Sequence, residues 1–424
     1  MSDSSSWEYI PVLDAILQVF ATIGLGALTG LLGILKPSDF VPLAIRFVHF
    51  VALPALVLKG IGIGVDFYDE ANIWAYIISF LILRAISLAL ALLAVLFSNW
   101  RAGRSAQGLG HVAVLWLTFT WISTVIMGIP ICSAVFGNPA LGVKYGLLAG
   151  MSSFMFQLPV QLIFLECHAM ETGSAPQVAP QLNVIEEAIK EEEEEEEEEQ
   201  EPADPETPVE SADTQLAANT TKQEEQAIDS KWWILVHVDS ASRIEVLFKM
   251  LYRVLKNPIL WGIFWGFVIS LSTAGRYLDC SPPMPAEECV EGLGWIEKTL
   301  GWLGNTVSPV ALFAMGLWMH GQGFQKLFSI GLTRLSFFMI VKCILVPLIM
   351  VGLAKGMDLD DQAGRAAILI ASLPISLASF SLGHQYQIGE ADLAANVAAG
   401  TLLMLPTILV WNLVLDKVDL YPIP

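Results

Sequence analysis

Long runs of apolar residues recur along this 424-residue chain, and each is about as long as a membrane-spanning helix. An α-helix needs about 20 residues to cross a hydrocarbon core of roughly 30 Å. The runs lie at approximately 12–35, 42–64, 73–98, 112–137, 141–166, 257–275, 302–321, 329–354, 365–387 and 391–415. Hydrophobic residues make up 54% of the chain and charged residues only 15%, which excludes an ordinary water-soluble globular protein. The pattern predicts an all-α integral membrane protein of about ten transmembrane helices.

One long polar segment separates the fifth run from the sixth. From about residue 168 to 240 the composition changes to Glu, Pro, Thr, Gln and Ala, with an unbroken Glu run at 191–199. Such a segment repels itself and cannot bury enough apolar surface to become ordered. Much of the net charge of −20 lies here, so that charge says little about partners. We predict a membrane repeat at 1–166, an acidic disordered loop at 167–240 and a second membrane repeat at 241–424.

Lys and Arg near the ends of the runs predict the orientation of the chain. Their modest bias places the N-terminus outside or in the lumen, with Arg365 on the outer flank, and the acidic loop in the cytosol. Cys280 and Cys289 then face an oxidising side, where they could form a disulfide. The first apolar run has no Lys or Arg before it and is too long for a signal peptide, so we expect it to remain as a span.

The five runs on one side of the acidic segment match the five on the other side in order. The fourth runs pair "GIPICSAVFG" with "SLPISLASFSLG", and the fifth pair "AGMSSFMFQLP" with "AGTLLMLP". Since five is an odd number, the second set begins on the opposite side of the membrane, and the repeat is inverted. Inverted repeats are typical of secondary transporters, whose sites lie near the midplane where broken helices from the two halves meet.

Proline interrupts the fourth run of each half, at Pro130 and Pro374. A proline lacks a backbone donor, and a broken helix is tolerated in a membrane only where its polar groups face a cavity, a ligand or protein. The N-terminal end of a half-helix carries about half a positive charge, so two such ends suit an organic anion. The alternative is that each proline only shapes packing. The predicted substrate-binding residues are Ser123, Thr124, Gly128, Pro130, Ile131, Pro374, Ile375, Ser376 and Ser379.

Three cations lie in or beside apolar runs: Lys59, Arg84 and Lys342. We expect them to tune the field at the site or to gate it, with membrane anchoring as the alternative. No Asp or Glu lies in the middle of a run, which disfavours coupling through a buried acid. A potential of about 100 mV would contribute roughly 2.3 kcal/mol per charge to the efflux of an anion. No Asp pair, zinc motif or Ser/His pair indicates an enzyme, and we expect no cofactor, no metal and no nucleic-acid partner.

At four motifs the sequence resembles the auxin efflux carrier family, which comprises the PIN-type and PIN-like carriers. The motifs are "TVIMGIP" (124–130), "LKNPILWG" (255–262), "VSPVALFAMGLWM" (307–319) and "LPISLASFSLGHQY" (373–386). The resemblance implies a fold like that of the bile-acid/sodium symporters, in which a scaffold and a mobile transport domain are built from ten helices. It also implies a crossover of the fourth and ninth helices, an elevator motion and a homodimer in the lipid bilayer of the plasma membrane or the endoplasmic reticulum.

The chain departs from the family at the predicted site. Ser123 stands where PIN-type carriers have an asparagine, and Ile375 stands where they have a glutamine. The resemblance implies an auxin-like carboxylate, while another small organic anion is equally compatible with these residues. We therefore predict a uniporter that exports a small organic anion. The alternatives are a sodium- or proton-coupled symporter on the same fold and a non-transporting scaffold or receptor that signals through the acidic loop.

Overall fold

The computed structural model describes residues 10–65, 67, 71–102, 108–172, 252, 255–272, 294–322 and 329–422. The predicted acidic loop from residue 173 onward, Cys280 and Cys289 lie outside the described residues. Within the described ranges the chain is helical and contains no β-strand, apart from one isolated bridge. The predicted all-α fold is therefore confirmed, while the three-part division of the chain stays a prediction.

The helices of the first half are α1 (Ile10–Leu31), α2 (Pro37–Phe47), α3 (Leu53–Gly62), α4 (Ala71–Ala102), α5 (Leu109–Thr120), α6 (Gly128–Phe136), α7 (Pro139–Ser152) and α8 (Leu158–Thr172). Those of the second half are α12 (Pro258–Leu271), α14 (Gly294–Asn305), α15 (Val307–Gln322), α16 (Leu332–Ile340), α17 (Val346–Gly356), α18 (Asp361–Ala371), α19 (Leu377–Gln385) and α20 (Glu390–Lys417). Three π-helical turns join neighbouring helices: η2 (Val48–Ala52), η3 (Ser153–Gln157) and η6 (Val341–Leu345).

Seven of the described helical stretches are long and apolar enough to cross a membrane. They are Pro11–Leu31, Pro37–Gly62, Asn72–Arg101, Pro139–Ala169, Gly294–Gly321, Leu332–Gly356 and Glu390–Lys417. Of the other three predicted runs, 257–275 contains the shorter apolar helix α12, and 112–137 and 365–387 are each divided into two short helices. The chain is thus an integral membrane protein, and two of its predicted spans are broken.

Local sequence signals account for several helix starts. Pro139 and Pro258 occupy the first turn of α7 and α12, where a missing N–H costs nothing. In both helices an asparagine precedes the proline, and its side chain accepts a hydrogen bond from a backbone N–H of the first turn. These caps fix where the helices begin.

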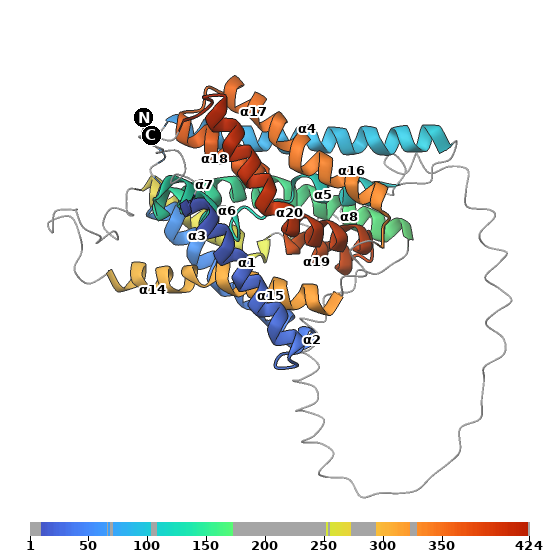
Figure 1. Ribbon diagram of the computed structural model, residues 1–424, viewed down its shortest axis with the longest axis horizontal. Helices are drawn as coiled ribbons and strands as arrows, with labels where there is room; N and C mark the ends of the chain where they lie inside the picture. Colours follow the sequence, from blue (N-terminus) through green and yellow to red (C-terminus); the bar gives the residue numbers. More distant parts are fainter. Residues whose placement is uncertain are drawn as a thin grey trace, which may run out of the picture.

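The described helices form two bundles, and each bundle contains helices from both halves of the sequence (Figure 1). In the first bundle α1 packs against α15, and α3 packs against α12 and α14. The second bundle contains α4 to α8 and α16 to α20, with α17 against α4 and α18 against α6 and α7. Contacts of α1 with α6 and of α3 with α7 join the two bundles.

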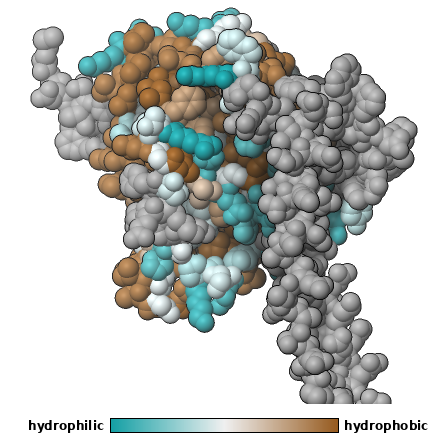
Figure 2. Space-filling view, turned by 90° about the vertical axis from the view of Figure 1, so that its right-hand side faces the viewer, coloured by the Kyte–Doolittle hydropathy of each residue, from teal (hydrophilic) through white to brown (hydrophobic). Residues whose placement is uncertain are grey.

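Glycines allow the helices of the first bundle to approach closely. A side chain at Gly26 of α1 would collide with the backbone carbonyl of Phe313 in α15, and one at Gly316 would collide with that of Ile23. Small residues serve this purpose in membrane helices, where close van der Waals packing drives association. Figure 2 shows that apolar residues cover much of the described surface on the face it presents, as expected for contact with lipid.

Candidate functional site

The two broken spans cross each other inside the second bundle. Residues 121–127 separate α5 from α6, and residues 372–376 separate α18 from α19. The two breaks run antiparallel and pair through main-chain atoms. The Ser123 N–H donates to the Pro374 carbonyl at 3.0 Å, and the Ser376 N–H donates to the Trp121 carbonyl at 2.8 Å. These bonds satisfy polar backbone groups that would otherwise be unpaired at the level of the breaks.

The two prolines occupy different places in this crossing. Pro374 lies in the non-helical segment itself, whereas Pro130 lies in the first turn of α6, which begins at Gly128. At a helix start the missing N–H of proline is not needed. Pro130 therefore marks the beginning of α6, while Pro374 prevents α18 and α19 from joining.

The hydroxyl groups in and beside the two breaks fall into two sets. The side chains of Ser133, Ser372 and Ser379 donate to carbonyls of their own helix or turn, and Ser376 caps the N-terminus of α19. Ser123 and Thr124 are buried, and neither side chain forms a hydrogen bond with another described residue. These two hydroxyls remain available to a ligand at the crossing.

Arg84 of α4 lies at the C-terminal end of α5. Its side chain is fully buried, and its guanidinium donates to the Thr120 carbonyl at 2.6 Å, which belongs to the last residue of that helix. The other acceptors are Ser152 Oγ at 2.9 Å, Ser153 Oγ at 2.6 Å, Gln157 Oε1 at 2.6 Å and the Ala149 carbonyl at 3.4 Å. The positive charge thus offsets the negative end of α5 and is surrounded by polar groups.

Lys342 of η6 has the equivalent place in the second half. Its ammonium donates to the carbonyl of Ala371 at 3.1 Å, and Ala371 is the last residue of α18. The Lys342 side chain is also buried. Both C-terminal ends at the crossing are therefore offset by a cation of the protein. The positive N-terminal ends of α6 and α19 also lie at the breaks, and no charged side chain of the described residues is bonded to them.

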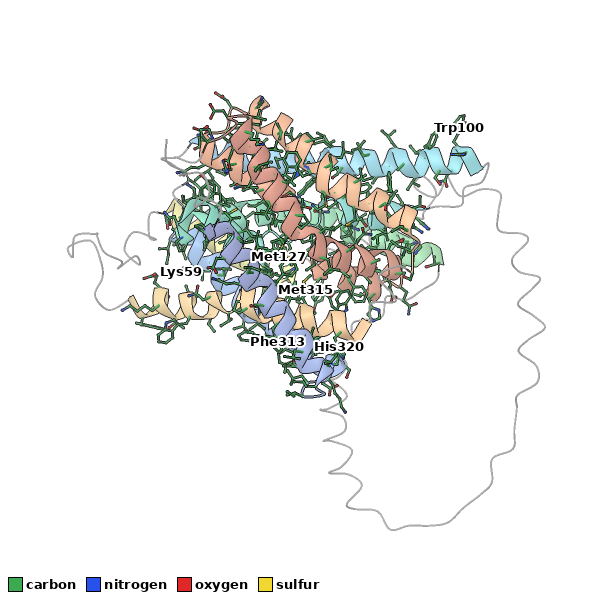
Figure 3. All side chains as sticks on the ribbon, viewed as in Figure 1. Lys59, Trp100, Met127, Phe313, Met315 and His320 are labelled. Atoms are coloured by element: carbon green, nitrogen blue, oxygen red, sulfur yellow. The ribbon has the colours of Figure 1, made fainter. Side chains whose placement is uncertain are left out.

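The third predicted cation lies elsewhere. Lys59, near the end of α3, pairs with Glu297 of α14 at 2.8 Å, inside the first bundle. A side chain at Gly301 would meet the Lys59 ammonium, so this glycine leaves room for the pair. In Figure 3 Lys59 lies on the side of α14, whereas Met127 lies at the break between α5 and α6. The structure brings Arg84 and Lys342 to the crossing, and Lys59 binds two helices of the first bundle together.

Comparison with known proteins decides the family. The model of the family described as "Membrane transport protein" matches residues 11–412, which is nearly the whole chain. The chain belongs to this family. Its members include auxin efflux carriers, so the resemblance found in the sequence is confirmed, and the chain is a membrane transporter and not an enzyme.

Three similar proteins illustrate the level of identity to this member of the membrane transport protein family. "Auxin efflux carrier component 8" of Arabidopsis thaliana is 24% identical over 303 residues, which are 69% of this chain and 68% of that protein. "Putative malonate transporter" of Rhizobium meliloti (strain 1021) is 25% identical over 37% of this chain and 43% of that protein. "Auxin efflux carrier component 7" of Arabidopsis thaliana is 26% identical over 40% of this chain and 25% of that protein. The matched regions therefore span less than half of the second and third relatives.

This member of the family has further polar groups at the crossing that the sequence did not single out. Gln157 accepts from Arg84 and donates to Thr120 Oγ1 at 3.0 Å. Gln157 and Ser153 are the ends of the π-helical turn η3, and such turns are frequent at functional sites. Lys342 also lies in a π-helical turn, η6. The only sequence signal for Gln157 and Ser153 is that they are polar residues within an otherwise apolar run.

The described part of this family member contains no group of three or more His, Cys, Asp or Glu side chains that could hold a metal ion. Cys132 and Cys343 are free thiols there. The polar groups at the crossing are hydroxyls, an amide, helix ends and two cations, a set that suits the binding of an anion.

Proposed function

We propose that this chain moves a small organic anion, an auxin-like carboxylate, across its membrane as a uniporter. The observation that carries the proposal is the charge arrangement at the crossing. Arg84 and Lys342 offset the two negative helix ends, and the positive ends of α6 and α19 lie beside the free hydroxyls of Ser123 and Thr124. A bound carboxylate would accept hydrogen bonds from these helix ends and hydroxyls, and it would need no ion pair with a positively charged side chain.

The same arrangement favours movement without a coupled cation. In transporters with broken helices, half-helix C-terminal ends commonly coordinate the coupling ion. Here those ends are bound by Arg84 at 2.6 Å and by Lys342 at 3.1 Å. The inside-negative potential would then drive the anion toward the outside, which is the direction expected of an efflux carrier.

An elevator motion is the proposed mechanism of alternating access. The crossing lies wholly in the second bundle, and the first bundle is held together by its own glycine contacts. We propose that the second bundle moves as a unit against the first and carries the crossing from one side of the membrane to the other. On the proposed orientation the N-terminus is outside and the acidic segment is in the cytosol.

Transport into proteoliposomes tests the function. Labelled indole-3-acetate and other carboxylates are added under an imposed potassium diffusion potential. We expect the rate of uptake to depend on the potential and not to change when a sodium or pH gradient is imposed. The double substitution Ser123→Ala with Ser376→Ala should reduce uptake, while Ser381→Ala, whose hydroxyl bonds within α19, should not. Uptake of no carboxylate, or an unchanged double variant, would contradict the proposal.

The same proteoliposome assay distinguishes the proposed uniporter from two alternative functions. Accumulation driven by a sodium or proton gradient would indicate a coupled symporter. A chain that lacks residues 173–240 should keep transporting if it is a carrier, and it should lose its function if it is a receptor that signals through that segment.

A further inference from the structure

Asn396 of α20 lies beside the crossing, on the face of α20 that meets the second broken span. Gly400, one turn later on the same face, approaches the Cβ atom of Pro374 so closely that a side chain there would lie 3.0 Å from it. One turn earlier, the Leu393 side chain packs against Gly383 of α19. These two contacts bracket Asn396, and they place it level with the first turns of α19.

The side chain of Asn396 is only half satisfied. Its Nδ2 donates to the backbone carbonyl of Asp392 at 2.7 Å, which fixes the orientation of the amide. Its Oδ1 is buried and has no hydrogen-bond partner among the described residues, and the residue is 1% exposed. Leaving a buried acceptor without a donor costs about 1–3 kcal/mol, so a donor that reaches this oxygen would be bound favourably.

The first half of the chain has no such group at the equivalent place. In both halves the segment Ala-Gly of the last span packs its glycine against the break, with Gly150 against Thr124 and Gly400 against Pro374. Four residues before Gly150 stands Gly146, which fits tightly against Ile129 and the Thr124 carbonyl. Asn396 therefore replaces a glycine of the first half and adds an acceptor on one side of the crossing only.

We propose that Asn396 contacts the transported anion and that its Oδ1 accepts a hydrogen bond from an N–H or O–H group of that anion. This inference rests on the proposed function. The carboxylate would lie at the N-terminal ends of α6 and α19, and the donor would reach Asn396, which lies about one helical turn from Gly400, roughly 6 Å along α20. The substrate class is a carboxylate with a hydrogen-bond donor at its far end.

A metal cation is a poorer occupant of this place. Asp392, one turn earlier, has one oxygen bound by the guanidinium of Arg334 at 2.6 Å. The pair formed by Arg334 and Asp392 carries no net charge, so it does not attract a further cation to Asn396. A neutral N–H or O–H donor needs no such attraction.

Matched pairs of anions test the inference in proteoliposomes. Each pair contains a donor-bearing anion and its methylated analogue: indole-3-acetate with 1-methylindole-3-acetate, and 4-hydroxyphenylacetate with 4-methoxyphenylacetate. We expect the intact chain to take up the donor-bearing member about tenfold faster or more, because a site built to bond a donor rejects an analogue that lacks it. In Asn396→Leu the ratio of the two rates should fall to about one.

Two further variants keep the result interpretable. Asn396→Gly introduces the residue found in the first half, and it should lose the preference as Asn396→Leu does. Thr401→Val changes a nearby hydroxyl that donates to the Val397 carbonyl within α20, and it should keep the preference. Because a ratio within one preparation is compared, the amount of folded protein does not affect it.

The outcomes separate the two proposals. Equal uptake of both members of each pair by the intact chain, or a preference that survives in both Asn396 variants, overturns the role of Asn396 and leaves the proposed carrier function standing. Uptake of neither member overturns the carrier function itself, and the role of Asn396 falls with it. The inference is supported only if the intact chain prefers the donor-bearing anion and both Asn396 variants lose that preference.

Discussion

Two buried cations bind the ends of equivalent half-helices, but they differ in how many partners hold them. Arg84 donates to five acceptors, among them the side chains of Ser153 and Gln157, whereas Lys342 donates to the single carbonyl of Ala371 among the described residues. Arginine offers five donors in a planar fork, and here all three guanidinium nitrogens donate to buried acceptors. We therefore expect Arg84 to contribute mainly to the stability of the second bundle and Lys342 to contribute mainly through its charge.

Substitution of the two cations should separate stability from transport. Arg84→Met leaves several buried acceptors without a donor, and we expect the free energy of unfolding to fall by about 3 kcal/mol or more. Lys342→Met leaves one, so we expect a loss of about 1 kcal/mol, with anion uptake reduced about three- to tenfold because the negative end of α18 is no longer offset. Thermal unfolding in detergent and uptake in liposomes measure the two effects. Equal destabilisation by both variants would contradict this assignment.

The pair formed by Lys59 and Glu297 should respond as an ion pair between two helices. Glu297→Gln should weaken the contact of α3 with α14 by about 1 kcal/mol or less, because the Lys59 side chain is 34% exposed. Exchanging the two residues, Lys59→Glu with Glu297→Lys, should restore stability in the same thermal assay. If transport falls in every variant while stability is restored by the exchange, Lys59 has a role at the substrate path in addition to this pair.

At the residue scale the sequence indicated which charges matter but not what they bind. Arg84 and Lys342 were recognisable because a cation inside an apolar run is rare. Their partners depend on the π-helical turns η3 and η6, and on the side-by-side packing of spans far apart in sequence, which no local pattern encodes. Arg365 is fully buried and donates to Asn412 Oδ1 at 2.7 Å and to Asp416 Oδ1 at 2.6 Å, partners that the charge pattern does not indicate, while its place on the outer flank stays a prediction. Asn396 was missed because the repeat offered no counterpart.

At the scale of whole helices, the predicted runs correspond to helical stretches of the structure with shifts of a few residues at most ends. A larger shift occurs at the run predicted for 302–321, which begins at Gly294 because α14 precedes α15. The breaks in the fourth run of each half were predictable, since Pro130, Pro374 and Gly128 disrupt a helix for reasons of covalent geometry. The number and inversion of the repeats remain a prediction from the sequence.

Glycine substitutions test how the first bundle is packed. Gly26→Ala and Gly316→Ala would each place a Cβ atom against the backbone of the facing helix, so α1 and α15 must separate. We expect each to lower the free energy of unfolding by about 1–3 kcal/mol. Gly24→Ala is the matched control on α1, because no atom lies within 4 Å of the added Cβ. It should be neutral or stabilise the helix by up to about 1 kcal/mol. Similar melting temperatures for all three variants would exclude a close contact between α1 and α15.

At the scale of the molecule, neither bundle is made from one half of the sequence alone. The first bundle pairs α1 with α15 and α3 with α12, and the second pairs α4 with α17 and joins the two breaks. A bundle of this kind cannot form until both halves have been synthesised. The boundaries that sequence composition suggests, before and after the acidic segment, are therefore not the boundaries of the packed units.

A covalent link between the bundles should stop an elevator motion. A Cβ atom at Gly60 of α3 would lie 3.0 Å from Val143 Cγ1 of α7 and would collide with Leu147 Cδ1 of the same helix, so Gly60→Cys and Val143→Cys are combined with Leu147→Ala to make room for the link. We expect oxidation of this pair to abolish uptake and reduction to restore it. The control pair, Gly62→Cys with Ile269→Cys, lies within the first bundle, where the two Cβ atoms would be 3.3 Å apart, and its oxidation should leave uptake unchanged. Uptake that continues after complete linkage of the first pair would exclude movement of the second bundle against the first.

The two hydrogen bonds that join the breaks are made entirely by main-chain atoms. The pairing of the two breaks therefore needs no hydrogen bond from the side chains at positions 123, 124 and 375. This has a practical consequence for redesign. If the proposed function is right, exchanging those few side chains should change which anion is transported, while the helices that present them stay as they are.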